Sequence, residues 1–386
     1  MAQEKKADTV AVHSGRMTQA HFGAVNTPVY RASTILQPDL ATLESGKAPY
    51  VYGRRGTPTS RSLEQLITEL EGGAQTELAP SGLGAISLAL LSICSAGDHL
   101  LVSDSAYAPT RNFCDRMLAR YGVETSYYDP LIGSRIAALM RPNTKAVFCE
   151  APGSLTFEMQ DIPAIAAAAH AKGASVLMDN TWATPIFFQP LAHGVDMSIQ
   201  AATKYIGGHA DLMMGYVTAN DSHKARLHHT HGDMGLYVSG DDCFLALRGL
   251  RTLPVRLQRH QETGLKLANW FLARPEVSRV LHPALESDPG HGLWQRDFKG
   301  ASGLFGVVLK PQSPNALAAL MDGLEYFGMG YSWGGFESLI VPAHIHRPAS
   351  QRHDDGPVIR IHAGLENPDD LIADLEAGFE RMRKAS

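Results

Sequence analysis

The sequence predicts an α/β protein whose larger part contains a mostly parallel sheet. Short apolar segments alternate with helical segments after residue 59. Several of the apolar segments have no polar face, which is typical of strands covered by helices on both sides. The candidate strands are residues 99–104, 123–129, 145–152, 175–181, 197–203 and 212–219. Ligands of such sheets bind where strands end, so polar residues that follow these segments are candidate site residues.

Differences in composition along the 386 residues predict three parts. Residues 1–58 are rich in turn-forming and aromatic residues and lack sustained helical periodicity, which predicts an extended N-terminal arm. Residues 59–250 form the larger α/β domain, in which residues 62–73 are an amphipathic helix closed by glycine. Residues 251–386 have a different pattern and predict a smaller C-terminal domain.

The predicted C-terminal domain begins with a long helix at residues 255–275. Two apolar strands follow, at residues 303–310 and 357–365, with helical segments between them. This order extends the α/β pattern, and the sequence contains no internal repeat.

Charge and composition exclude several classes of protein. The chain has 34 Lys and Arg against 39 Asp and Glu, and 44% of its residues are hydrophobic, so neither disorder nor nucleic-acid binding is expected. The N-terminal MAQEKKADTV lacks the apolar core of a signal peptide, and the apolar run at residues 83–94 is too short to span a bilayer. We therefore expect a cytoplasmic protein with no membrane partner.

The cysteines and histidines do not predict a metal site. The four cysteines are scattered without C-x-x-C spacing, which is typical of reduced, partly buried thiols. The histidines at 228–231 and 344–346 lack the helical spacing of a zinc motif, so we expect surface or loop histidines and no metal.

Lys204 follows the predicted strand 197–203 and precedes the pair Gly207 and Gly208. A desolvated lysine favours its neutral form, and a neutral amine can attack a carbonyl carbon to form a Schiff base. The glycines would let a bulky group approach the backbone. The alternative is a lysine that reaches solvent, and this stretch considered alone favours that alternative.

Asp179 lies near the end of the predicted strand 175–181. A carboxylate there requires a cationic partner, and the protonated ring nitrogen of pyridoxal 5'-phosphate (PLP) would be one. A helix N-cap is an equal alternative.

A possible phosphate site lies where a glycine turn leads into a helix. The backbone N–H groups of Gly82 and Leu83, together with the helix dipole, would bind a phosphate. Hydroxyl groups of Ser81 and Thr203 could add donors, although any tight turn before a helix has a similar pattern.

Arg360 lies inside the predicted strand 357–365. A buried arginine requires an anion, and its planar guanidinium suits the α-carboxylate of an amino acid. A structural salt bridge is the alternative. A Schiff-base lysine, a ring-nitrogen acid, a phosphate site and a carboxylate-binding arginine together predict a PLP-dependent enzyme acting on an amino acid.

Over nearly its whole length the chain resembles the Cys/Met-metabolism family of PLP-dependent enzymes of fold type I. The motifs that carry the resemblance are YGRRGTPT, SGLGA, DSAYAPTRNFCD, DPLIG, MDNTWATP, SIQAATKY, LRGLRTL, YSWGGFESL and IRIHAGLE. The resemblance implies carbon–sulfur lyase activity, namely β-elimination of L-cystathionine or a related cysteine conjugate to pyruvate, ammonia and a thiol. The alternative is γ-elimination from methionine, cystathionine or canavanine.

The resemblance also implies roles for the residues that bind the cofactor. Lys204 would hold PLP and afterwards move the substrate Cα proton, and Asp179 would pair with the ring nitrogen. The phosphate would be bound by Gly82, Leu83 and Thr203.

The substrate side of the site is implied in the same way. Tyr107 would stack on the cofactor ring, and Arg360 with Ser332 and Trp333 would hold the substrate carboxylate. Trp333 favours β-elimination, because relatives that catalyse γ-chemistry carry a smaller aliphatic residue there. Asn112 would lie near the far end of the substrate, where some β-lyases of this type have an acidic residue.

The resemblance implies that the site is shared between subunits. Tyr52, counted with Lys204 and Tyr107 as catalytic, and Arg54 would reach the cofactor from the neighbouring subunit. At least a dimer is therefore expected, and a homotetramer built as a dimer of dimers is implied. Two other classes of protein are alternatives, namely a non-catalytic regulator and a dinucleotide-dependent oxidoreductase. The lack of G-x-G-x-x-G disfavours the oxidoreductase.

Overall fold

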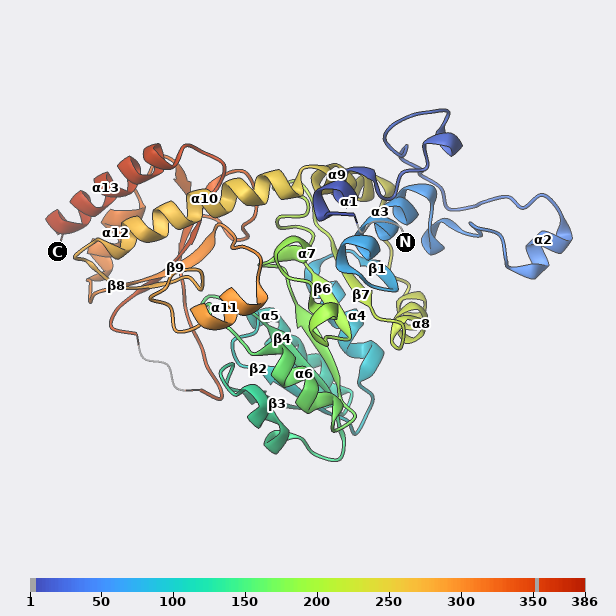
Figure 1. The fold of residues 1–386 in the computed structure, drawn as a ribbon, viewed down its shortest axis with the longest axis horizontal. Coiled ribbons are helices and arrows are strands. Elements are labelled where there is room, and N and C mark those ends of the chain that lie inside the picture. The colour runs from blue at the N-terminus through green and yellow to red at the C-terminus, as the bar shows by residue number, and fades with distance from the viewer. Residues whose placement is uncertain (1–4, 351–353, 386) are drawn as a thin grey trace.

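The computed structural model describes residues 5–350 and 354–385 and shows an α/β protein with two sheets (Figure 1). The larger sheet has seven strands in the order β1-β7-β6-β5-β4-β2-β3. They are β1 (Gln75–Ala79), β2 (His99–Ser103), β3 (Glu124–Tyr128), β4 (Thr144–Glu150), β5 (Ser175–Asp179), β6 (Met197–Gln200) and β7 (Gly215–Ala219). Strands β2 to β6 are parallel, whereas β7 is antiparallel to β1 and β6. The predicted fold class is confirmed.

All six strands predicted in this sheet are present, but β1 was missed. Its sequence, QTELA, contains an acid, Glu77, whose side chain is only 3% exposed. Glu77 is buried because His228 and His231 of another element pair with it. That pairing is a tertiary contact, so the local apolar pattern could not predict the strand.

Helices cover both faces of this sheet. They are α3 (Pro58–Glu71), α4 (Gly82–Ile93), α5 (Ala108–Phe113), α6 (Ile162–His170), α7 (Thr184–Phe187), α8 (Lys224–Met234) and α9 (Gly240–Arg251). Alternate residues of one strand enter different cores: Leu101 packs in the core with α6, whereas Leu100 and Val102 pack in the core with α4. Burial on both faces explains why these strands lack a polar face.

The predicted helix at 62–73 is α3, which begins four residues earlier than expected. Thr57 and Ser60 form a reciprocal capping box, and Pro58 occupies the first turn, where its missing N–H costs no hydrogen bond. Gly72 ends the helix with a φ of +66°, a left-handed conformation that glycine adopts without strain.

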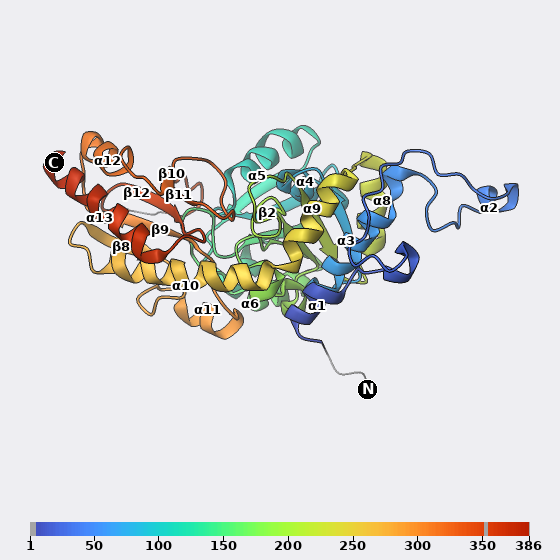
Figure 2. The same ribbon diagram turned by 90° about the horizontal axis from the view of Figure 1, so that it is seen from above.

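The smaller sheet has five strands in the order β10-β11-β12-β9-β8. They are β8 (Val277–Leu281), β9 (Leu304–Leu309), β10 (Phe327–Gly328), β11 (Ser338–Pro342) and β12 (Val358–His362). The associated helices are α10 (Leu253–Leu272), α11 (His291–Asp297), α12 (Pro314–Met321) and α13 (Pro368–Ala385). The long helix and the two strands predicted after residue 251 are thus α10, β9 and β12. From above, α10 runs from the larger part of the molecule into the smaller one (Figure 2).

The N-terminal segment is only partly an extended arm. Helix α1 (Ala7–His13) buries Val10 in the core formed with α3 and α9, and sequence patterning did not predict it. Beyond it, the chain leaves the body of the molecule as a long excursion that carries α2 (Leu40–Ser45) at its tip (Figure 1). Large apolar side chains on this excursion are exposed: Phe22, Val25, Leu36, Leu40 and Leu43.

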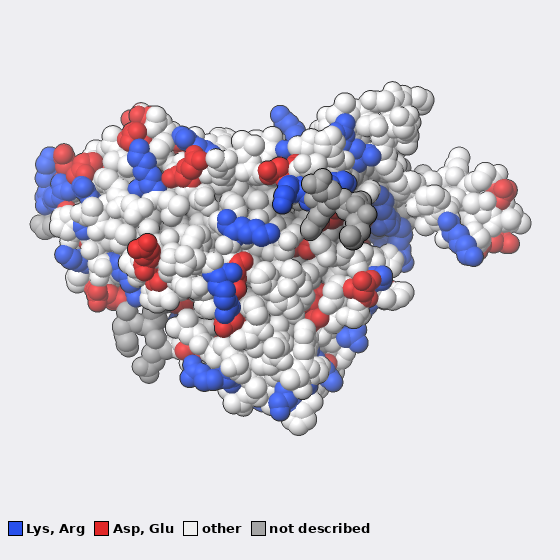
Figure 3. Space-filling view, viewed as in Figure 1, with Lys and Arg blue, Asp and Glu red and all other residues white. Residues whose placement is uncertain are grey.

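Basic and acidic side chains are interspersed on the face of the molecule drawn in Figure 3. Within residues 5–350 and 354–385, no helix is long and apolar enough to cross a bilayer. The four cysteines are free and buried, as predicted.

Candidate active site at the carboxyl ends of the central strands

Three neighbouring strands of the larger sheet end in polar residues at the same edge. Strand β4 ends at Glu150, β5 ends at Asp179, and β6 leads through a short turn to Lys204. Because the three strands are parallel, their carboxyl ends lie side by side, which is where sheets of this type bind ligands. The site is built around this edge.

Lys204 is mostly buried. Its Nζ donates a hydrogen bond to Ser332 Oγ at 2.6 Å and lies 5.4 Å from the centre of the Trp333 ring. Burial and, to a smaller extent, Arg360 lower the pKa of the lysine to about 8, and Asp179 opposes both effects. A substantial fraction of the amine is therefore neutral near pH 8 and able to act as a nucleophile.

The glycines after Lys204 serve a different purpose from the one predicted. Gly208 has a φ of +72°, and a Cβ there would lie 2.1 Å from Nη1 of Arg256. Arg256 is buried and donates hydrogen bonds to the backbone oxygens of Tyr205 and Gly249, both at 2.8 Å. The expectation of space for a bulky ligand was wrong for Gly208, because this glycine makes room for a structural arginine.

Asp179 is 8% exposed and is not a helix cap. Its Oδ1 accepts hydrogen bonds from the backbone N of Thr181 at 2.9 Å and from Thr181 Oγ1 at 2.5 Å. The next helix, α7, begins at Thr184 and has Ala183 at its N-cap, which excludes the N-cap alternative. Burial raises the pKa of Asp179, and the Thr181 hydrogen bonds and Lys204 oppose this effect. A buried cationic partner would favour its ionised form.

The predicted phosphate site is the N-terminus of α4. Ser81 is the N-cap, and its hydroxyl accepts a hydrogen bond from Gly84 N at 3.0 Å, which leaves its O–H as a donor. The first N–H groups of a helix have no partner within it, which leaves those of Gly82 and Leu83 for a ligand. A Cβ on Gly82 would lie 2.6 Å from the Cβ of Ala201, so glycine allows the helix to start beside the strand end that carries Lys204.

Thr203 directly precedes Lys204 in the chain, and its hydroxyl group is already hydrogen-bonded. Oγ1 accepts a hydrogen bond from Met214 N at 3.0 Å and donates one to Met214 O at 3.1 Å. Its role toward a phosphate stays a prediction.

Arg360 has no acidic partner among the described residues. On β12, its Nη2 donates to the backbone oxygen of Ser332 at 2.9 Å, and its Nε is buried without a partner. Burial lowers its pKa, as expected for a cation without an anion. The salt-bridge alternative is therefore excluded within the described chain, and the unsatisfied guanidinium suits an incoming carboxylate.

Ser332 and Trp333 connect Lys204 to Arg360. Ser332 accepts the Lys204 hydrogen bond through its side chain and the Arg360 hydrogen bond through its backbone. It has a φ of +83°, which is rare for a residue other than glycine and typical of functional sites. The Trp333 ring packs edge-on against Tyr205, at 5.4 Å between ring centres.

Tyr107 lies at the N-terminus of α5 with 46% of its surface exposed. Burial, Glu150 and Asp179 raise the pKa of its phenol, and Arg360 lowers it. Its ring therefore lies among these groups, at the position where stacking on a cofactor is predicted. Asn112, on the same helix, is exposed, and its proposed contact with substrate stays a prediction.

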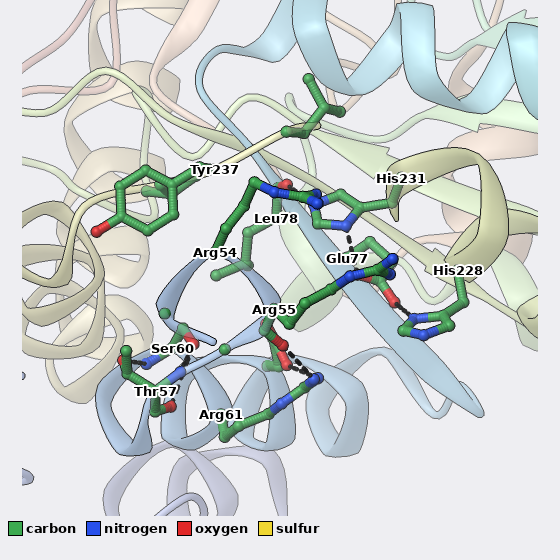
Figure 4. A pocket seen from close by; sticks show the side chains of 15 residues that line it. Arg54, Arg55, Thr57, Ser60, Arg61, Glu77, Leu78, His228, His231 and Tyr237 are labelled. Carbon is green, nitrogen blue, oxygen red and sulfur yellow. Dashed lines mark hydrogen bonds and ion pairs between the residues drawn. The ribbon is translucent and has the colours of Figure 1, made fainter. Parts of the chain in front are cut away.

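Tyr52 and Arg54 are not brought to Lys204. Arg54 lines a separate pocket beside α8, where its Nη1 donates to Gly232 O at 3.0 Å (Figure 4). Tyr52 is 47% exposed and bridges to Thr34 on the projecting arm. Neither residue lies where it would serve the Lys204 of its own chain.

The pocket of Figure 4 also shows why the histidines of α8 were misjudged. His228 and His231 both point at Glu77 of β1, at 2.7 and 3.2 Å. His231 is only 14% exposed and belongs to a helix, so the prediction of a surface or loop histidine was wrong for it. Within the described residues, no group of three or more potential metal ligands is found.

Sequence reasoning missed Glu150. It ends a predicted strand, and the rule that singled out Asp179 applies to it equally. Because Glu150 pairs in register with Asp179, the structure places two carboxyl groups at neighbouring positions of the site edge.

The residues at this edge fit PLP on four counts. They offer free N–H groups for a phosphate, an amine that is neutral near pH 8, a buried carboxyl for a ring nitrogen and an unpaired arginine for an amino-acid carboxylate. Together with the mostly parallel sheet, this set is typical of the PLP-dependent enzymes of fold type I.

The chain belongs to the Cys/Met metabolism PLP-dependent enzyme family, whose model matches residues 8–380. Cystathionine beta-lyase MetC of Escherichia coli is 46% identical over 392 residues, covering 98% of this chain and 99% of that protein. A cystathionine gamma synthase from Xanthomonas oryzae, solved with aminoacrylate and cysteine, has a TM-score of 0.91 and 33% identity, with 100% of both chains covered. An L-alanine/L-glutamate racemase of Wolbachia pipientis is 38% identical over 395 residues, covering 98% of each chain.

Proposed function

We propose that the protein is a carbon–sulfur lyase that catalyses β-elimination of L-cystathionine, or of a related cysteine conjugate, to pyruvate, ammonia and a thiol. The observation that carries the proposal is the Ser332 bridge. It places the Lys204 amine 2.6 Å from a residue whose backbone oxygen is held by the unpaired Arg360. A group that moves a proton thus lies beside a group that binds an amino-acid carboxylate. The 46% identity to a cystathionine beta-lyase supports this activity.

The residues divide the work as follows. When bound, PLP supplies an electron sink that stabilises the negative charge left at Cα. Asp179 would hold the cofactor's ring nitrogen in its charged form, and Arg360 would orient the substrate by its carboxylate. Lys204, once its amine is free, would take the proton from Cα, since its lowered pKa suits a base near neutral pH. Trp333, packed on Tyr205, would exclude water from this side.

Proton removal from Cα does not by itself decide the product. Return of a proton to the opposite face of Cα would give a racemase, and loss of a γ-substituent would give a γ-lyase, an alternative with which the similarity to a cystathionine gamma synthase is consistent. Asn112 of α5 is an exposed amide, so this position offers no carboxylate to the far end of the substrate. Other cysteine conjugates are therefore included in the proposal.

A substrate panel tests the proposal. We expect purified protein with PLP to release pyruvate from L-cystathionine, with one thiol formed for each pyruvate. Cystine, methionine, homoserine and canavanine would be supplied separately, and L-alanine would be tested for racemisation. Release of 2-oxobutyrate from cystathionine would show γ-elimination and would contradict the proposed β-elimination. Racemisation without any keto acid would reject the lyase assignment.

We also propose that the active enzyme is at least a dimer, built further into a tetramer, in which residues 1–58 complete the neighbouring site. Residues 59–250 would bind PLP, and residues 251–386 would supply Arg360. Three observations support the shared site. Arg54 lies in a pocket apart from Lys204, Tyr52 is half exposed, and apolar side chains of the arm are uncovered in a single chain.

Co-expression of two impaired variants provides a direct check of the shared site. Arg54→Ala is expected to lower kcat/KM by about 10- to 100-fold, because a charged hydrogen bond to the phosphate is lost. Co-expression with Lys204→Ala should restore roughly a quarter of wild-type activity, since random pairing gives mixed dimers with one intact site of two. If Arg54 served its own chain, every mixed site would carry a defect, and no activity would return. Lys47→Ala, on the same arm, is the matched control.

A further inference from the structure

Glu150 is the site residue to which the proposed function gives no role. It is the last residue of β4 and pairs in register with Asp179, the last residue of β5. Register partners of parallel strands project from the same face of the sheet, so both carboxyl groups belong to the same site. Glu150 is less completely buried than the four β4 residues before it.

One oxygen of Glu150 has a defined partner. Oε2 accepts a hydrogen bond from the backbone N of Tyr107 at 2.7 Å. Tyr107 precedes the first turn of α5, has no side-chain cap and is 46% exposed, so this hydrogen bond ties the start of α5 to the sheet. Among the described residues, Oε1 has no hydrogen-bond partner.

The charges around Glu150 favour its neutral form. Asp179 faces it from β5, Arg111 lies nearby on α5, and no described residue forms an ion pair with it. Arg111 directs its Nη1 to the backbone oxygen of His346 instead. Burial and Asp179 raise the pKa of Glu150 well above its ordinary value, whereas the Tyr107 hydrogen bond and Arg111 only oppose this effect.

Glu150 and Asp179 are register partners on neighbouring strands, and ionisation of one carboxyl group opposes ionisation of the other. The ionised form is better stabilised at Asp179, because Thr181 donates two hydrogen bonds to its Oδ1 and Lys204 lies near it. A proton is therefore assigned to Glu150, which receives one hydrogen bond from a neutral amide.

We propose that Glu150 is a positioning residue that holds the backbone of Tyr107 as a neutral carboxylic acid, leaving the single negative charge of this site edge at Asp179. Tyr107 would then keep its ring at the cofactor without a second anion that competes for the charged ring nitrogen. The proposal rests on the proposed function only for the roles of Tyr107 and Asp179.

A pair of variants of similar length separates the two parts of this proposal. Glu150→Gln keeps an oxygen acceptor for Tyr107 N, whereas Glu150→Met fills the same space without one. Three quantities are measured: the dissociation constant of PLP, the pH midpoint of the visible band of the bound cofactor, and kcat with KM for cystathionine. The melting temperature of the cofactor-free protein reports separately on folding.

We expect Glu150→Gln to bind PLP within about twofold of wild type, with the spectral midpoint unchanged to about 0.3 unit, because a neutral acid is replaced by a neutral amide. Glu150→Met should weaken PLP binding by about tenfold or more, because the Tyr107 N–H loses its acceptor. Glu124→Gln, an exposed acid on β3 paired with Arg141, is the control for removal of a carboxyl from the same sheet.

Two results would overturn the proposal. A fall of about one unit in the spectral midpoint of Glu150→Gln would mean that Glu150 is an anion, because removing a nearby negative charge destabilises the protonated cofactor. If Glu150→Met bound PLP as tightly as wild type, the hydrogen bond from Tyr107 N to Glu150 would not contribute to cofactor binding. Both tests use PLP without substrate, so they stand even if cystathionine is not the substrate, and failure of the wild type to bind PLP would instead reject the proposed function.

Discussion

Lys204→Ala is expected to lower cystathionine turnover by about 10⁴-fold, the upper end of the contribution of a general acid–base group. The effect is large because one amine has two proposed tasks, holding PLP and moving the Cα proton. No other lysine is available to take over, since among the described contacts Lys204 is the lysine next to Ser332, Trp333 and Asp179. Turnover is measured as pyruvate release with PLP in excess.

The Lys204 prediction has a second readout that does not depend on turnover. Borohydride reduction should fix PLP to wild-type protein through a peptide that contains Lys204, and the Lys204→Ala variant should lose PLP on denaturation after the same treatment. Lys172→Ala, an exposed lysine after α6, is the matched control. Retention of more than about 1% of activity would mean that another group moves the proton, since a loss below 10²-fold is small for this role.

Arg360→Leu is expected to lower kcat/KM by about 10²- to 10³-fold, chiefly through KM, because the substrate carboxylate loses its charged partner. Arg360→Lys should lose less but should not match wild type, since an ammonium group cannot donate the paired hydrogen bonds of a guanidinium. The measurement is steady-state kinetics with cystathionine at saturating PLP. Arg383→Leu, on the surface of α13, provides the control for loss of an arginine.

Stability separates a binding role of Arg360 from a structural one. The partly buried guanidinium has no acidic partner among the described residues, and its Nε is buried without a hydrogen bond, so the cofactor-free Arg360→Leu protein should be as stable as wild type or more stable. A marked drop in its melting temperature together with an unchanged KM would contradict the proposed role and would favour a structural arginine.

The sequence predicted the elements of the larger sheet well because burial on both faces leaves a local trace. The five central strands appear as apolar runs, and helix α3 has both a capping box and a terminating glycine. Among the elements that were missed, β1 and α1 have a different character. The acid of β1 is buried only because histidines of α8 reach it, and α1 is a short helix stabilised by packing on α3 and α9.

Candidate site residues were accessible to sequence reasoning where they follow apolar strands. Lys204 and Asp179 were found by this rule, and Glu150 could have been found by it, whereas Arg360 was found as a cation inside an apolar strand. Gly208 was misinterpreted because the group that needs its space, Arg256, lies 48 positions further along the chain. No local pattern carries that contact.

The sequence by itself determined the class of fold, the ionisable residues at the predicted strands and the chemistry that these residues suit. Strand periodicity and residue type are local properties, so both can be seen in the sequence. The tertiary structure decided which of those residues meet. It brought Ser332, in the segment between β10 and β11, between Lys204 and Arg360. It also left Arg360 without an acid among the described residues and placed Arg54 away from the Lys204 of its own chain. These relations depend on how two sheets and an arm pack, and packing joins residues that the chain keeps more than a hundred positions apart.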